Sequence, residues 1–122
     1  TEEALLAALD RPYISGLTLL GGEPFEPDNQ RALLPFLRRL RQQLPDKTVW
    51  AFSGYTWEEL TGQSRARCEA TGALLSLVDV LVDGEFVEAL RDISLRFRGS
   101  SNQRLLDVPA SLAAGRPIPW EG

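Results

Sequence analysis

The stretch Gly16-Leu-Thr-Leu-Leu-Gly-Gly-Glu-Pro-Phe25 sets the pattern of the whole chain. Its apolar segment Leu17–Leu20 predicts a buried β-strand, which the following glycines and proline end. In parallel α/β folds, ligands bind at the carboxyl ends of the strands. Paired glycines let a ligand approach the backbone, and free carbonyls beside a carboxylate accept hydrogen bonds from an ammonium group. Gly21, Gly22 and Glu23 are therefore candidate ligand-binding residues, with a plain strand-to-helix turn as the alternative.

Strands and helices alternate on both sides of this stretch. Thr1–Leu9 predicts a helix, and leucines recurring at spacings of four and three predict another over Asp28–Leu44, which Pro35 should kink or split. The unbroken apolar run in Thr48–Phe52 predicts a strand covered on both faces. The other expected elements are strands at Val80–Val82, Leu95–Arg98 and Leu105–Val108, helices from Trp57, over Arg65–Leu77 and at Phe86–Leu90, and an irregular tail from Pro109. This alternation predicts a single α/β domain over residues 1–122, with a mostly parallel sheet and right-handed crossovers.

Two further strand ends repeat the pattern of a small or polar residue followed by glycine. Ser53 precedes Gly54 after the second expected strand, and Asp83 precedes Gly84 after the third. Parallel strands have their carboxyl ends at one edge, so we expect Ser53 and Asp83 to lie near Glu23. Asp83 is suited to a ligand hydroxyl or ammonium group, although each pair taken singly is also an ordinary turn.

A polar loop lies in the second half of the chain, before the last expected strand. It contains Arg98, Gly99, Ser100, Ser101 and Asn102, and it brings arginine and hydrogen-bonding side chains around one glycine. Such a loop is suited to a carboxylate, a phosphate or the backbone of a partner protein, and a solvated loop is the alternative.

Composition excludes several classes of function. The 122 residues carry a net charge of −4, which gives no electrostatic case for binding nucleic acid or an anionic membrane. No apolar run approaches a membrane span, and no secretory signal is recognisable, so we expect a cytoplasmic protein. There is no His and a single Cys, Cys68, expected to be half-buried on a helix; the chain alone therefore offers no metal site. No Gly-x-x-x-x-Gly-Lys or Gly-x-Gly-x-x-Gly motif is present.

Together these segments resemble the activating proteins of anaerobic (class III) ribonucleotide reductase, within the radical S-adenosylmethionine superfamily. The resemblance runs from about Ile14 to Val108. It is carried by Gly16–Phe25, by Val49-Trp-Ala-Phe-Ser-Gly-Tyr-Thr-Trp-Glu-Glu-Leu60, by Val78-Asp-Val-Leu-Val-Asp-Gly-Glu-Phe86 and by Phe97-Arg-Gly-Ser-Ser-Asn-Gln-Arg104.

The resemblance implies a partial (β/α) barrel and a reaction in which a [4Fe–4S] cluster reductively cleaves S-adenosylmethionine. The 5′-deoxyadenosyl radical then leaves a glycyl radical on the large reductase subunit, with electrons from an external donor such as flavodoxin. It also implies that Gly21, Gly22 and Glu23 meet the methionine end of the cofactor, and by looser analogy that Ser53 and Asp83 face it.

One departure from the family is large. The family holds its cluster with C-x-x-x-C-x-x-C upstream of the Gly-Gly-Glu-Pro strand, and here none of the residues before Gly21 is Cys. With no Met in the chain, we expect a domain truncated at its N-terminus, which keeps cofactor-contacting positions and lacks catalysis by itself. A pyruvate formate-lyase-type activating enzyme and a non-catalytic interaction domain of the same fold are the alternatives.

Overall fold

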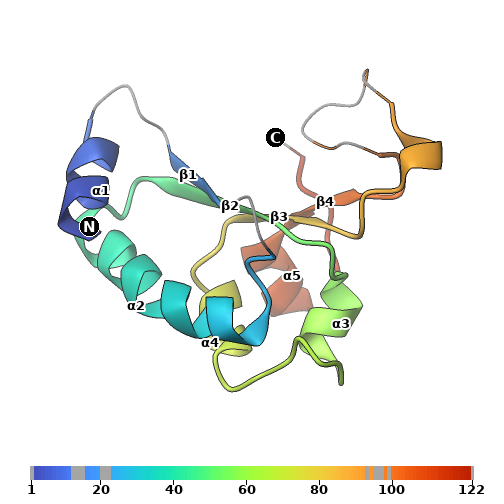
Figure 1. The fold of residues 1–122 in the computed structure, drawn as a ribbon, viewed down its shortest axis with the longest axis horizontal. Helices are drawn as coiled ribbons and strands as arrows, with labels where there is room; N and C mark the ends of the chain where they lie inside the picture. The colour runs from blue at the N-terminus through green and yellow to red at the C-terminus, as the bar shows by residue number, and fades with distance from the viewer. Residues whose placement is uncertain are drawn as a thin grey trace.

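The chain folds as one sheet with helices packed on one side of it (Figure 1). The computed structural model describes residues 2–11, 16–19, 23–92, 94, 98 and 100–121. The elements follow in the order α1 (Glu2–Leu9), β1 (Gly16–Leu19), α2 (Pro27–Gln43), β2 (Thr48–Phe52), α3 (Trp57–Thr61), α4 (Thr71–Leu75), β3 (Val80–Asp83), the 3-10 helix η1 (Glu88–Leu90), β4 (Arg104–Asp107) and α5 (Val108–Ala114).

The sheet is mostly parallel, with its strands in the order β1-β2-β3-β4. β1 pairs with β2 and β2 with β3 in parallel, so the expected neighbouring parallel strands are confirmed. β4 pairs with β3 in the antiparallel direction, with Leu81 opposite Leu106. The α/β class is therefore confirmed, and the sheet formed by the described strands is open.

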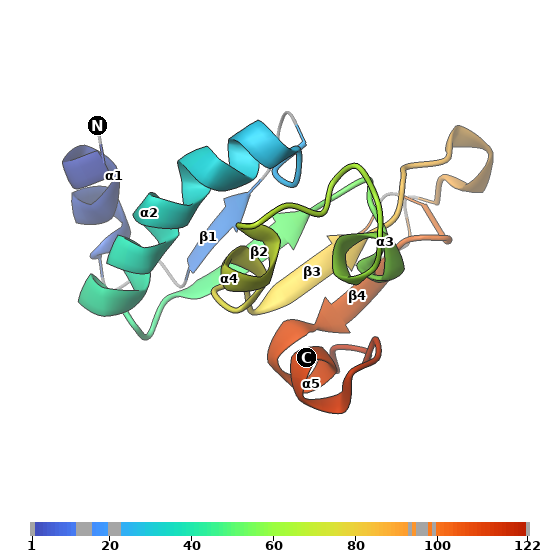
Figure 2. The same ribbon diagram turned by 90° about the horizontal axis from the view of Figure 1, so that it is seen from below.

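One face of the sheet forms the core with the helices. Leu19, Val49, Ala51 and Leu81 alternate along β1 to β3 and pack in one cluster with the buried apolar residues of the helices. Figure 2, seen from below, shows α2, α4 and α3 on this face, with α2 running alongside β1. The two-sided cover expected for β2 is only partial, because Thr48 is exposed and Trp50 and Phe52 are half-buried.

The C-terminal segment covers part of the opposite face. The ring of Trp120 meets that of Trp50 edge-on, with centroids 4.8 Å apart. Trp120 N–H donates to Leu105 O at 2.9 Å, and Asp107 N–H donates to Ile118 O at 2.9 Å, so this segment lies along β4.

Capping residues define the start of α3 and both ends of α5. Thr56 and Glu59 form the expected capping box at the start of α3. The irregular tail expected from Pro109 was wrong, because Asp107 caps α5 by accepting a hydrogen bond from Ala110 N–H at 3.0 Å. Gly115, with φ of 71°, ends that helix in the left-handed conformation.

Two other helices also differ from expectation. Pro35 does not split α2, which runs unbroken from Pro27 to Gln43. The helix expected over Arg65–Leu77 shortens to α4, because the Ala66 carbonyl bonds to a side chain of α2 and not along a helix. Cys68 is half-buried as expected, but lies before α4 and outside any helix.

The remaining expectations fall near the end of β3. The short helix expected at Phe86–Leu90 is the 3-10 helix η1. The strand expected at Leu95–Arg98 lies outside the described residues except for Arg98, which has no regular structure.

Candidate functional site

Glu23 joins the loops that follow β1 and β2. Its Oε2 accepts a hydrogen bond from Ser53 Oγ at 2.8 Å and another from Phe25 N–H at 2.9 Å. Its Oε1 accepts from Gly54 N–H at 2.6 Å. Glu23 is half-buried and Ser53 is buried. The structure therefore brings Glu23 and Ser53 together, as the shared sheet edge predicted, while Gly21 and Gly22 lie outside the described residues.

A second link runs parallel to the first. Tyr55 donates its hydroxyl hydrogen to Glu26 Oε1 at 2.6 Å, and Arg65 Nη2 donates to the same oxygen at 2.8 Å. The Arg65 guanidinium also lies over the Tyr55 ring, 5.7 Å from its centroid. The hydrogen bond to Glu26, with burial adding to it, raises the pKa of Tyr55 above its usual value. These contacts fix the first turn of α2 against the loop after β2.

Asp83 lies at the same sheet edge but is fully engaged within the chain. Its carboxylate is completely buried and accepts from Trp57 N–H at 2.7 Å. Arg104 Nε donates to its other oxygen, Oδ1, at 2.9 Å, and Arg104 Nη2 forms an ion pair with Oδ2, the oxygen that accepts from Trp57. Arg104 also pairs with Glu58 at 2.7 Å, and its hydrogen bonds, first to Asp83 and then to Glu58, raise its pKa. The carboxylate thus holds the start of α3 against β4.

Gln30 supports the loop after β1 from beneath. It is fully buried, and its Nε2 donates to Phe25 O and to Ala66 O, both at 2.7 Å. Its Oε1 accepts from Thr71 Oγ1 at 2.6 Å. Sequence reasoning missed this residue, although a glutamine on the same face of α2 as Leu33 was a usable signal.

The predicted polar loop is held by hydrogen bonds between its own residues. Ser100 is buried, and its Oγ donates to Asn102 Oδ1 at 2.6 Å. Arg98 Nη1 donates to Gln103 O at 2.6 Å. Ser101 is exposed, and Gly99 lies outside the described residues.

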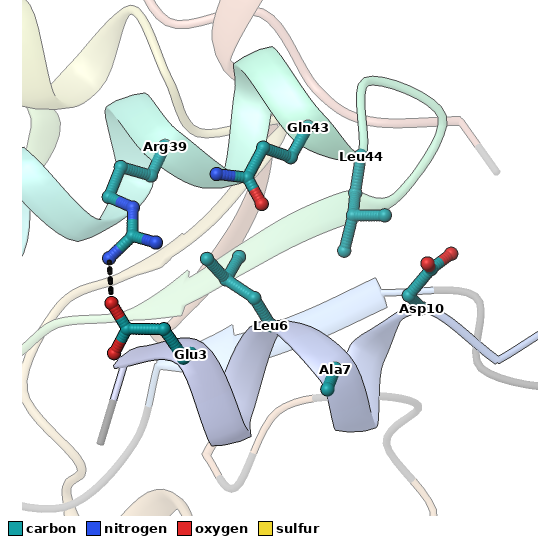
Figure 3. Close-up of a pocket in the computed structure, with 7 residues that line it drawn as sticks. All are labelled: Glu3, Leu6, Ala7, Asp10, Arg39, Gln43 and Leu44. Atoms are coloured by element: carbon teal, nitrogen blue, oxygen red, sulfur yellow. Dashed lines mark hydrogen bonds and ion pairs between the residues drawn. The ribbon is translucent and has the colours of Figure 1, made fainter.

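A hollow on the helical side lies away from this edge. It has a volume of about 290 Å³ and lies between α1 and the last turns of α2 (Figure 3). Glu3 and Arg39 form an ion pair across it at 3.4 Å. Its lining residues are Glu3, Leu6, Ala7, Asp10, Arg39, Gln43 and Leu44. None of the residues predicted for the site lines this hollow.

A family comparison identifies the chain. The family model described as a 4Fe-4S single cluster domain matches residues 1–106. The chain belongs to this family.

Relatives of the chain carry a more specific name. A protein of Haemophilus influenzae named anaerobic ribonucleoside-triphosphate reductase-activating protein is 46% identical over 88 residues, which are 72% of this chain and 52% of the relative. Proteins of the same name from Vibrio cholerae and from Enterobacteria phage T4 are 39% and 33% identical, covering 84% and 86% of this chain and 63% and 61% of their own lengths. The chain thus spans half to just under two thirds of these relatives. The resemblance to the anaerobic ribonucleotide reductase-activating proteins is confirmed, while no solved structure matched the chain.

The residues present do not fit the cluster that names the family. Within the described part of the chain, no group of three or more His, Cys, Asp or Glu side chains is arranged to hold a metal ion. Cys68, the single cysteine of the sequence, lies 3.5 Å from Gln30 Oε1 in the supporting network under the loop. None of the helices in the described ranges is long and apolar enough to cross a bilayer.

Proposed function

We propose that this chain is the cofactor-orienting part of an enzyme that reductively cleaves S-adenosylmethionine and generates a glycyl radical on anaerobic ribonucleotide reductase. The observation that carries the proposal is the Glu23 carboxylate, held by Ser53 and Gly54 at the carboxyl edge of three parallel strands. The names of the relatives support the reductase as the partner.

The chemistry of Glu23 supports an ammonium ligand. A carboxylate has about four lone-pair positions, and three donors among the described residues bond to this one. One position is left for a further donor, and the partly exposed side chain lets a ligand reach it. Glu23, with the backbone of Gly21 and Gly22, then binds the methionine end of the cofactor. Ser53 contributes through its bond to Glu23, and Asp83 contributes by holding α3 in place.

The whole protein supplies what this chain does not. We place the ligands of the [4Fe–4S] cluster outside the chain, since the single cysteine cannot hold one. In the whole protein, the cluster would supply the electron for cleavage of the carbon–sulfur bond, and an external donor such as flavodoxin would provide that electron. The chain's own residues bind the cofactor, orient it and exclude competing reactions. In the full-length protein, the open sheet then forms part of a (β/α) barrel, with the helices on its outer face.

Cofactor binding tests this proposal in the full-length protein. Glu23→Ala should weaken S-adenosylmethionine binding by about tenfold or more, because a charge-assisted hydrogen bond contributes roughly 1.5–3 kcal/mol. Gly22→Val should also weaken binding, by adding bulk where the ligand approaches the backbone. Glu69→Ala, which removes an exposed carboxylate on the helical side, is the matched control. Calorimetric titration that gives unchanged affinity for folded Glu23→Ala would refute the assignment.

A further inference from the structure

A projecting arm after β3 exposes three large apolar side chains. The arm comprises residues 85–91, includes η1, and extends beyond the end of β3 on the side of the sheet away from the helices (Figure 1). Phe86, Val87 and Leu90 have 46%, 37% and 42% of their surface exposed. The other exposed large apolar side chains in the described ranges, Leu5 and Leu112, lie singly in α1 and α5. Apolar residues gathered in this way mark an interaction site more often than scattered ones do.

The arm is held in its position by the polar loop. Asn102 Nδ2 donates to Glu85 O at 2.8 Å, and Gln103 Nε2 donates to Gly84 O at 3.0 Å. Val87 N–H donates to Ser100 Oγ at 3.2 Å. At the end of the arm, Ser101 N–H donates to Leu90 O at 3.0 Å, next to the isolated bridge between Arg91 and Ser100. Among the residues predicted to meet a partner, Ser100 and Asn102 are therefore occupied in bracing the arm. The exposed apolar side chains of the arm are left to make the contact.

The base of the arm belongs to the edge that carries Glu23. β3 leads directly into Gly84, whose N–H donates to Tyr55 O at 3.1 Å. Gly84 has φ of 97°, a conformation that favours glycine, and it turns the chain out of the sheet. Tyr55 is in turn bonded to Glu26, next to the loop of Glu23. A protein bound to the arm is thereby placed beside the loops proposed to bind the cofactor.

We infer that Phe86, Val87 and Leu90 form the docking surface for the large subunit of the anaerobic ribonucleotide reductase. This inference rests on the proposed function, which requires a protein substrate to reach the carboxyl edge of the sheet. Protein partners bury apolar anchors within a polar rim. Glu85, Glu88 and Arg91 are exposed polar neighbours of these three residues along the arm. The polar loop acts as the positioning support of this surface.

The test uses the full-length protein with Phe86→Ser and Leu90→Ser combined, and Leu112→Ser as the control of equal exposure. The dissociation constant for the large subunit is measured by calorimetry, and cofactor cleavage is measured without the subunit. The double variant should raise the dissociation constant at least about tenfold, since anchor residues typically dominate binding energy. It should leave cofactor cleavage without the subunit unchanged, and Leu112→Ser should change neither quantity.

Four results would overturn the inference. An affinity within twofold of wild type would remove the arm from the interface. If light scattering shows that the double variant has a different oligomeric state from wild type, the surface contacts a second copy of the chain. If the double variant melts at a lower temperature than wild type, the surface is buried against another part of the same protein. A wild-type protein that does not bind the subunit overturns it as well; if that protein also fails to cleave the cofactor, the proposed function fails with it. Cleavage with normal binding by the double variant rejects only the docking surface.

Discussion

Replacing Asp83 by asparagine tests whether this carboxylate is a structural group. The substitution keeps the size of the side chain but removes its charge and turns one acceptor oxygen into a donor. That donor then faces either Trp57 N–H or the Arg104 guanidinium, both of which now bond to the carboxylate. Because the side chain is only 1% exposed, water cannot replace the lost partner.

The size of the effect follows from these contacts. Removing one partner of a buried ion pair costs about 3–5 kcal/mol when the remaining charge has no other partner. Here Arg104 is 39% exposed and keeps Glu58, so we expect a smaller loss of about 2–3 kcal/mol in the free energy of unfolding. With a urea m-value of about 2 kcal/mol per molar, the unfolding midpoint should fall by about 1–1.5 M.

Urea unfolding followed by tryptophan fluorescence measures this loss. Glu58→Gln is the control, because it removes the partly exposed carboxylate on the same arginine and should cost less than about 1 kcal/mol. A loss below about 1 kcal/mol for Asp83→Asn would refute the structural role. If the same variant also bound S-adenosylmethionine much more weakly, direct contact of Asp83 with the cofactor, as the sequence predicted, would be favoured.

Three further outcomes are expected from single contacts. Gln30→Leu should lower the unfolding free energy in urea titrations by about 2–4 kcal/mol, because it leaves the buried carbonyls of Phe25 and Ala66 without donors. The control Gln42→Leu, at an exposed position, should change the unfolding free energy by less than about 0.5 kcal/mol. Gly16→Ala should destabilise by about 1–3 kcal/mol, because its Cβ would overlap the backbone of the neighbouring strand, while Gly72→Ala in α4 should stabilise by about 0.5–1 kcal/mol. A melting temperature that rises for Gly16→Ala or falls for Gly72→Ala would contradict this reasoning. Tyr55 has a raised pKa, so its neutral form stabilises the fold fully below a pH of about 10, and this stabilisation is lost as the pH rises through the raised pKa. The pH titration of the absorbance at 295 nm, taken as the difference between wild type and Tyr55→Phe, should have a midpoint above that of free tyrosine.

The sequence specified the parallel part of the fold because each strand carries its own local signals. Apolar runs ended by glycine located β1, β2 and β3, and the capping box located α3, since these features depend on neighbours along the chain. The length of α4 could not be predicted from the local sequence, because a long-range hydrogen bond from Gln30 to Ala66 O takes the place of a helical hydrogen bond there. α5, in contrast, had readable signals in Asp107, Pro109 and Gly115 that were interpreted as an irregular tail.

The candidate site was predictable in position and less so in detail. The small and polar residues that follow each strand predicted that Glu23, Ser53 and Asp83 lie at one edge, because the carboxyl ends of parallel strands share an edge of the sheet. The sequence could not show that Asp83 turns toward the helices, since its partners Trp57 and Arg104 come from distant elements. Nor could it show the bracing of the arm, which arises from pairings across the polar loop.

The most direct test of the central claim is the electron paramagnetic resonance spectrum of the large reductase subunit after incubation with the full-length protein. The mixture contains a reconstituted cluster, a reductant and S-adenosylmethionine under anaerobic conditions. We expect a glycyl radical signal that requires the cofactor, together with methionine and 5′-deoxyadenosine as products, and a much weaker signal with Glu23→Ala. A radical formed on pyruvate formate-lyase and not on the reductase would contradict the assignment of the partner. A radical that forms without the cofactor, or no radical on either protein, would contradict the proposed activity itself.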